Sequence, residues 1–201
     1  MIYIEYIRRR PGIEIEDFHE TFLRVQRAWE SGASEDQLIL NAARTWRIGP
    51  EPEYFTVWHT ANAGFGRIDE WQRIFDDRAA KGHESPLKRV ARMDAAGCYD
   101  ALRPPLKCQD GLYYVERFTP RVNREALRDA FEKRAGGHPQ FTLALLADRV
   151  GSLGPNPPGF AIWVVPCFGA LEEIAEEVQD GDAHVRVDLA GVYVDVGREI
   201  L

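Results

Sequence analysis

The sequence predicts an α+β fold in which two tandem βαββαβ repeats close into one barrel within a single chain. Two observations indicate this. Blocks of the first half recur in the same order in the second half, and each half shows the same succession of strand-like and helix-like apolar periodicity. The repeats are expected at residues 1–101 and 112–201. The linker is expected at 102–111, which contains two prolines and no periodicity.

The clearest repeated block surrounds a Gly-Pro-x-Pro turn. Residues 44–58 align with residues 149–163 without a gap, at a constant offset of 105, and share the turn and the Phe and Trp of the strand that follows. Four collinear blocks indicate a gene duplication. The three shorter blocks pair residues 3–5 with 114–116, 65–71 with 168–174, and 96–99 with 190–193.

Each half is expected to contain four strands and two helices. The first helix has one apolar stripe, formed by Phe18, Phe22, Val25 and Trp29. The segment 81–93 has no counterpart in the second half and predicts an extra helix or a lid. In the first half the strands are expected at 2–9, 38–47, 54–60 and 96–101, and the helices at 14–29 and 67–79. In the second half the strands are expected at 112–118, 141–150, 159–165 and 191–196, and the helices at 124–133 and 170–178.

Composition excludes several classes of function. The net charge of -7, from 32 acidic and 25 basic residues, disfavours nucleic acid and anionic membranes as partners. The apolar runs are only strand-length, and no signal-peptide pattern is present, so we expect a cytoplasmic location. Cys98, Cys108 and Cys167 form no C-x-x-C pair, and no histidines are paired at metal-binding spacing. We therefore expect neither a disulfide framework nor a metal site.

A βαββαβ unit forms a four-stranded antiparallel sheet with both helices on one face, the ferredoxin-like arrangement. The bare face needs a cover, which a second sheet supplies. With this element order, the turn at residues 46–50 (WRIGP) and the strand containing Trp58, the chain resembles the dimeric α/β-barrel superfamily, particularly its NIPSNAP-like and ABM-like members. In that superfamily two chains usually form the barrel, so the resemblance implies an intramolecular pseudo-dimer here. It leaves open a homodimer of two such pseudo-dimers.

Strand alternation sorts side chains onto two faces. We expect the apolar set, such as Ile4, Phe55 and Val57, to pack under the helices, which would turn the intervening aromatic and polar residues toward a cavity inside the barrel. Such a lining suits a flat, partly apolar small molecule. The substrate-binding residues expected on this basis are Tyr3, Asn41, Arg44, Tyr54, Thr56, Trp58 and Tyr99.

Differences between the halves point to the N-terminal one as the working copy. Polar residues there align with smaller or apolar residues in the second half, as expected if only one pocket was retained after duplication. The substitutions are Asn41 to Leu146, Trp46 to Gly151, Thr56 to Ala161 and His59 to Val164.

The expected catalytic residues are His59, Glu5 and Glu116. A carboxylate in a half-dry cavity has its pKa raised into the range useful for proton transfer, although each glutamate could instead pair with an arginine, for which Arg44, Arg149 and Arg117 are the candidates. His59 titrates near neutrality but could equally be a hydrogen-bonded structural residue. Among the other histidines, His19 is expected to be exposed and His83 to lie in the lid, while the family resemblance makes His138 and His184 candidate haem ligands.

These features predict a small-molecule enzyme of the isomerase, lyase or cyclase type. It would perform proton transfer on an unsaturated or aromatic acid or carbonyl compound, without a cofactor. One alternative that the resemblance implies is a cofactor-independent or haem-binding monooxygenase, in which Trp58 and Asn41 would position the substrate. Another is a non-catalytic small-molecule-binding or stress-response module.

Overall fold

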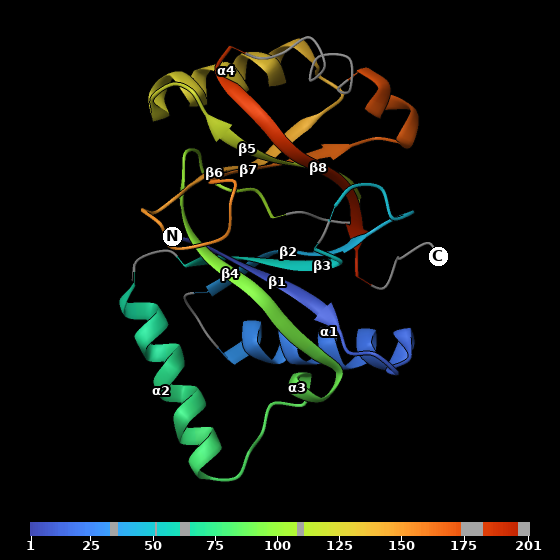
Figure 1. Cartoon of the computed structure of the whole chain (residues 1–201), viewed down its shortest axis with the longest axis vertical. Coiled ribbons are helices and arrows are strands. Elements are labelled where there is room, and N and C mark those ends of the chain that lie inside the picture. The colour runs from blue at the N-terminus through green and yellow to red at the C-terminus, as the bar shows by residue number, and fades with distance from the viewer. Residues whose placement is uncertain (33–35, 51, 61–64, 108–110, 174–182, 197–201) are drawn as a thin grey trace.

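The structure is a computed structural model that describes residues 1–32, 36–50, 52–60, 65–107, 111–173 and 183–196. It is an α+β fold whose helices lie outside an antiparallel sheet (Figure 1). The elements of the first half are β1 (Ile2–Arg9), α1 (Ile15–Gly32), β2 (Asp36–Arg44), β3 (Tyr54–Thr60), α2 (Gly66–Ala80), α3 (Leu87–Val90) and β4 (Ala91–Ala101). Those of the second half are β5 (Leu112–Pro120), α4 (Arg124–Gly137), β6 (Thr142–Arg149), β7 (Gly159–Val165), η1 (Phe168–Ala170) and β8 (Val185–Asp195).

The strands close into a barrel in the order β1-β3-β2-β8-β5-β7-β6-β4. The order β4-β1-β3-β2 of one half matches the order β8-β5-β7-β6 of the other. Two short seams join the halves, where β2 pairs with β8 and β4 pairs with β6 over three residue pairs each. In Figure 1, α1, α2 and α3 lie on one side of the barrel and α4 on the other, so the layers are helix, sheet, sheet and helix.

The Gly-Pro turns close the seams by bringing backbones into direct contact. A Cβ added to Gly49 would lie 2.4 Å from the Cα of Gly191, and one added to Gly154 would lie 2.9 Å from the Cα of Gly97. Only glycine permits this approach, and Gly49 also has a positive φ of 97°. The repeated glycines therefore serve the assembly of the barrel.

Each turn is held by the arginine that precedes it. Arg44 Nη1 donates to the carbonyl oxygen of Gly49 at 3.1 Å, and Arg149 Nη1 donates to that of Gly154 at 2.7 Å. Neither arginine pairs with the glutamates that the sequence offered as partners. Arg44, which was expected to bind substrate, is therefore held by its hydrogen bond to the Gly-Pro turn that follows it.

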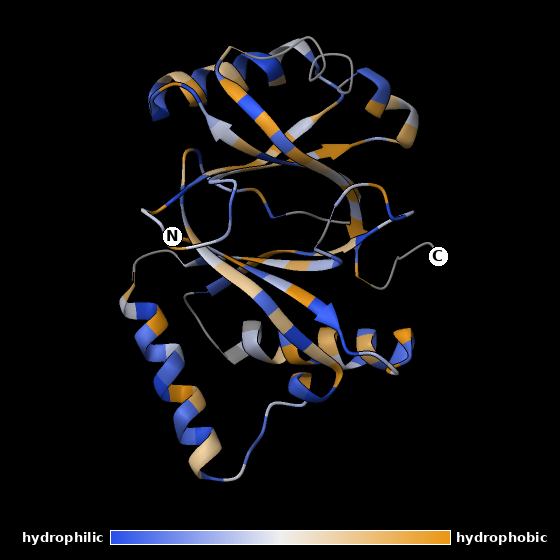
Figure 2. Ribbon diagram, in the orientation of Figure 1, coloured by the Kyte–Doolittle hydropathy of each residue, from blue (hydrophilic) through white to orange (hydrophobic). Residues whose placement is uncertain are grey.

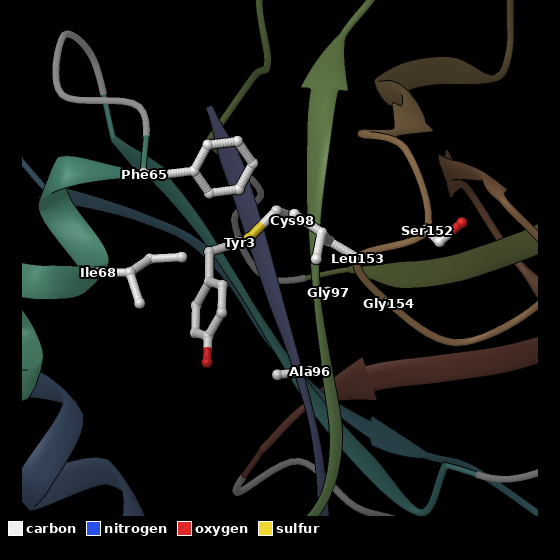
Figure 3. A pocket seen from close by; sticks show the side chains of 9 residues that line it. All are labelled: Tyr3, Phe65, Ile68, Ala96, Gly97, Cys98, Ser152, Leu153 and Gly154. Carbon is white, nitrogen blue, oxygen red and sulfur yellow. The ribbon is translucent and has the colours of Figure 1, made fainter.

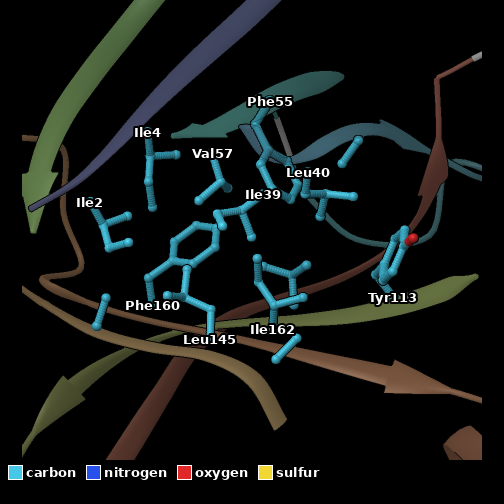
Figure 4. Packing of buried hydrophobic residues seen from close by; sticks show 14 of the residues in the cluster. Ile2, Ile4, Ile39, Leu40, Phe55, Val57, Tyr113, Leu145, Phe160 and Ile162 are labelled. Atoms are coloured by element: carbon cyan, nitrogen blue, oxygen red, sulfur yellow. The ribbon is translucent and has the colours of Figure 1, made fainter. Parts of the chain in front are cut away.

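The barrel interior is a packed apolar core, so the expected cavity lining was assigned to the wrong face. Ile4, Phe55, Val57, Phe160 and Ile162 point toward one another between the two sheets (Figure 4). The Phe55 and Phe160 ring centroids are 5.6 Å apart. Tyr6, Tyr99, Tyr113 and Tyr193 belong to the same core, so the interior is mainly apolar and includes several tyrosine rings. Of the expected cavity-lining aromatic residues, Tyr3, Tyr54 and Trp58 lie instead on the face that the helices cover.

Some element boundaries also differ from expectation. β4 begins at Ala91, within the segment expected to be an extra helix or lid, and only the short α3 precedes it there. Its charged start is compatible with a strand because Asp94 pairs on the outer face with Arg8 at 2.7 Å and Arg92 at 2.9 Å. The helix expected at 170–178 lies mostly outside the described residues.

The helices are polar on their outer surface. In Figure 2 hydrophilic residues dominate α2 along its length. No helix in the described part of the chain is both long and apolar enough to cross a membrane.

Candidate functional site

Three of the expected site residues form a row across the N-terminal sheet, on the face that the helices cover. Glu5 lies opposite Thr56 in the β1–β3 pair, and Thr56 lies opposite Asn41 in the β3–β2 pair. Thr56 Oγ1 donates to Glu5 Oε2 at 2.7 Å, and Trp58 Nε1 donates to the same oxygen at 3.3 Å. The polar residues that distinguish the N-terminal half therefore converge, but outside the barrel core.

The corresponding row of the second half keeps only the glutamate. Glu116 lies opposite Ala161, which lies opposite Leu146. The Glu116 side chain is fully buried, and Arg134 Nη1 of α4 donates to its two carboxylate oxygens at 2.8 and 3.0 Å. Trp163 Nε1 donates to it at 3.1 Å. The negative charge of Glu116 is thus neutralised by a positive one.

Glu5 has no equivalent of Arg134. When Leu127, Phe131 and Arg134 of α4 are aligned by spacing with Phe18, Phe22 and Val25 of α1, an apolar residue stands at the position of the arginine. Among the described residues no cationic side chain forms an ion pair with Glu5.

The environment of Glu5 favours its neutral form more than water does. Burial raises the pKa of the Glu5 carboxyl, and the hydrogen bonds from Thr56 and Trp58 oppose part of that rise. A carboxyl group with a raised pKa and a fixed orientation can accept and return a proton near neutral pH.

A cavity of about 410 Å³ is lined by neighbours of Glu5, among them Tyr3 on the same strand and Ala96 on the next strand, but not by Glu5 itself. It lies between Tyr3 of β1, the stretch of β4 from Ala96 to Cys98, the start of α2 at Phe65 and Ile68, and residues 152–154 of the turn from the second half (Figure 3). Ala96 lies directly opposite Glu5 in the β1–β4 pair. The cavity therefore approaches the Ala96 end of the polar row.

The α2 side of this cavity is held in place by a buried ion pair. Arg67 Nη2 of α2 lies 2.8 Å from Asp36 Oδ2, and Trp71 Nε1 donates to the same oxygen at 3.0 Å. The Trp71 ring also packs against Tyr3, with centroids 5.1 Å apart. These contacts attach α2 to β1 and β2 and thereby position the lining residues Phe65 and Ile68.

Tyr3 and Cys98 supply polar hydrogens to the cavity. Burial, then the charge of Glu5 and then that of Cys98, raise the pKa of the Tyr3 hydroxyl, and burial raises the pKa of the Cys98 thiol. Both groups therefore stay protonated at neutral pH. Cys98 was not among the expected site residues, although its difference from the aligned Val192 was a signal that could have identified it.

A smaller cavity of about 140 Å³ lies at the Asn41 end of the row. It is bounded by Leu23 of α1, by the linker at Lys107 and by Asp195 of β8. Asn41 Oδ1 is buried without a hydrogen-bond donor. The two cavities thus lie at opposite ends of the same cross-sheet row.

The remaining expected site residues lie elsewhere. Tyr54 faces α1, where its ring centroid is 4.5 Å from that of Phe18, and Tyr99 belongs to the barrel core. His59 lies on the same face of β3 as Val57, and Thr56 lies on the other face. His59 therefore does not meet Glu5. Burial, followed by the charge of the N-terminal amine, lowers the pKa of His59.

The other histidines lie away from both cavities. His138 stacks on Phe141 and lies 3.7 Å from Glu173, whereas His19, His83 and His184 line neither cavity. Within the described ranges no group of three His, Cys, Asp or Glu side chains could hold a metal ion.

Comparison with known proteins supports the fold. No protein-family model and no curated protein matches the chain. Among solved structures, a mutant chlorite dismutase from Candidatus Nitrospira defluvii in complex with cyanide is similar, with a TM-score of 0.58 over 97% of this chain and 91% of that one. The sequence identity is 9%, so this likeness shows the shared fold alone.

Proposed function

We propose that the chain is an enzyme that transfers a proton on a small molecule bound in the 410 Å³ cavity, with Glu5 as the acid and base. The carrying observation is the contrast between the two glutamates. Glu116 is neutralised by Arg134, as a structural carboxylate is, whereas no described cation pairs with Glu5, and its neighbours Tyr3 and Ala96 line the cavity. Isomerisation, elimination and cyclisation all need such a group.

The neighbours of Glu5 suit this role. Thr56 and Trp58 donate to one oxygen, Oε2, and so fix the carboxylate without neutralising it. Their hydrogen bonds favour the ionised form, which is the base. Unsaturated or aromatic acids and carbonyl compounds are the substrates whose C–H bonds are acidic enough for a carboxylate base. In this proposal Glu116 has a structural role, and a role for His59 would require a separate site.

We also infer that the barrel arose by fusion of two copies of a βαββαβ unit, as the resemblance to NIPSNAP-like and ABM-like proteins suggests. The identical strand order of the halves and the paired glycine contacts at the two seams support this origin. The second copy then kept Glu116 but lost the polar partners Thr56 and Asn41, and gained Arg134.

The test is incorporation of solvent deuterium into a panel of unsaturated and aromatic acids and carbonyl compounds, followed by mass spectrometry. The wild-type chain should incorporate deuterium into at least one compound, and the Glu5→Gln chain should not. The Glu5→Gln chain should remain folded, because the glutamine amide oxygen can still accept the hydrogen bonds from Thr56 and Trp58. Equal incorporation by both chains, or unfolding of Glu5→Gln, would assign Glu5 to structure and favour a non-catalytic binding module.

Haem-dependent chemistry, the alternative suggested by the family resemblance, fits the described residues poorly. A haem needs an axial ligand such as histidine. His138 and His184 line neither cavity, and the residues that line the larger cavity include no histidine. The likeness in fold to chlorite dismutase supports an enzyme of this barrel architecture, and the carboxyl of Glu5, whose neighbours line the cavity, favours proton transfer over haem chemistry in this proposal.

A further inference from the structure

The larger cavity contains no charge of its own. None of the nine side chains that line it is charged, and its polar hydrogens come from Tyr3, Cys98 and Ser152. An anionic ligand would lose its hydration there without gaining a counter-ion, which costs several kcal/mol.

The charges around the cavity also disfavour an anion. Arg67 lies between the lining residues Phe65 and Ile68 on α2, but its guanidinium is bound by Asp36 and Glu70. Arg149 and the N-terminal amine carry positive charges near the lining residues Gly154 and Cys98, but both already donate to backbone carbonyl oxygens. The charge of Glu5 is negative and would repel a carboxylate. The cavity therefore favours a neutral ligand with an apolar body.

The Tyr3 hydroxyl is placed to bind a carbonyl oxygen. In Figure 3 the Tyr3 side chain extends toward Ala96, with the hydroxyl leading. Ala96 is the residue opposite Glu5 in the β1–β4 pair, and the charge of Glu5 acts on the Tyr3 hydroxyl, so the two groups lie near each other. The hydroxyl stays protonated because burial and the charge of Glu5 raise its pKa. It is therefore a hydrogen-bond donor throughout the physiological range.

We propose that the substrate is a neutral, enolisable carbonyl compound, that Tyr3 donates a hydrogen bond to its carbonyl oxygen, and that Glu5 removes the proton from the adjacent carbon. The inference rests on the proposed function. As the C–H bond breaks, the proton passes to the Glu5 carboxylate and the electron pair forms a C=C bond, leaving negative charge on the oxygen that Tyr3 binds. Return of the proton to a carbon of the enolate restores the Glu5 carboxylate, so no oxidant or co-reactant is consumed.

The test compares two probes that differ in one group. Phenylacetone and phenylpyruvate share a benzylic CH₂ next to a ketone, but the first carries a methyl group where the second carries a carboxylate. Exchange of the CH₂ protons in D₂O is followed by proton NMR. The wild-type chain should accelerate exchange of phenylacetone over buffer at least about tenfold more than exchange of phenylpyruvate, a difference of about 1.4 kcal/mol.

The outcomes separate this inference from the proposed function. Acceleration with phenylpyruvate equal to or greater than that with phenylacetone would overturn the neutral substrate class but leave Glu5 as a proton-transfer residue. Acceleration with neither probe would overturn the neutral substrate class, while deuterium incorporation into other members of the panel would show whether Glu5 still transfers protons.

Variants test the role of Tyr3. Tyr3→Phe should slow phenylacetone exchange by about 10²- to 10³-fold, the usual effect of losing one donor to a developing oxyanion. Tyr114→Phe changes the counterpart in the second half and should leave the exchange rate unchanged. Equal rates for Tyr3→Phe and wild type, with both chains folded by circular dichroism, would overturn the role of Tyr3.

Discussion

Arg134 Nη1 lies 2.8 Å from Glu116 Oε1, and the carboxylate is completely removed from solvent. The guanidinium carbon also lies 4.9 Å from the centre of the Trp163 ring. A buried carboxylate needs such a partner because desolvation alone would make its charge unfavourable. Arg134 therefore turns a residue that could transfer protons into a structural one.

Arg134→Met is expected to lower the free energy of unfolding by about 3–5 kcal/mol, because it leaves the Glu116 charge buried and unpaired. Part of the loss should be recovered in acid, where protonation of Glu116 removes that charge. Urea denaturation at pH 7 and pH 4.5 measures both effects. Arg128→Met breaks an exposed pair with Asp129 on the same helix and should cost less than about 1 kcal/mol. Equal losses for the two variants would contradict the structural role of Arg134.

Glu5 should destabilise the fold as the pH rises. Burial raises the pKa of its carboxyl in the folded chain, so between the ordinary value of about 4.3 and the folded value the native state binds more protons than the unfolded state. Stability therefore falls with rising pH in that range. Glu5→Gln removes this term, and its stability relative to wild type should increase from pH 4 to pH 7, measured by urea denaturation. A difference that stays constant with pH would contradict the raised pKa. Exposed Glu84 is the control position.

Thr56→Val tests how the row sets the protonation state of Glu5. Thr56 donates to the ionised carboxylate, so its loss raises the pKa of Glu5 further and moves the acid limb of the pH–rate profile to higher pH. Proton exchange below that limb should slow at least about tenfold, as expected for a hydrogen bond to a charged group worth about 1.5–3 kcal/mol. At high pH the two rates should converge. A uniform loss of rate at every pH would instead indicate disturbed packing, and exposed Thr142→Val is the matched control.

The sequence predicted the α+β fold because apolar periodicity and the recurrence of sequence blocks can be read directly from the chain. The strand β3 was found at its observed bounds from alternation between two turns. The repeat also identified Asn41 and Thr56 as polar residues that one half keeps and the other lacks, and the structure brings both into one row with Glu5.

The expectation that this row faces the barrel interior was wrong. Alternation divides the residues of a strand between two faces but does not show which face is inside. The alternating pattern of the sequence would be the same if Thr56 faced the interior and Phe55 faced the helices. Their placement depends on the second sheet, whose apolar face makes the interior dry, and on partners from the helices. The pairing of Glu116 with Arg134 of α4 is likewise a tertiary contact that only helix packing determines.

The interior location of Phe160 is tested by truncation. Phe160→Ala should lower the free energy of unfolding by about 3–5 kcal/mol, because its ring contacts Phe55 and Tyr99 in a core without access to water. Phe75→Ala on α2 removes a ring that is 48% exposed and should cost about 1 kcal/mol or less. Guanidinium denaturation distinguishes the two. If the two variants lost similar amounts of unfolding free energy, Phe160 would not lie in a packed interior, and the barrel could enclose a cavity.

Gly49→Ala tests whether the Gly-Pro turns join the halves. The variant suffers two penalties, a side chain at a φ of 97° and a Cβ 2.4 Å from the backbone of Gly191. Gly12→Ala suffers only the first, since Gly12 has a φ of 79° and nothing within 4 Å of an added Cβ. The control should therefore cost about 1–2 kcal/mol, the price of a left-handed L-residue. Gly49→Ala should cost clearly more, because the seam between β2 and β8 has only three residue pairs and its backbone must shift. Thermal denaturation of both variants measures the difference, and equal melting temperatures would show that the close contact of Gly49 with Gly191 does not hold the barrel together.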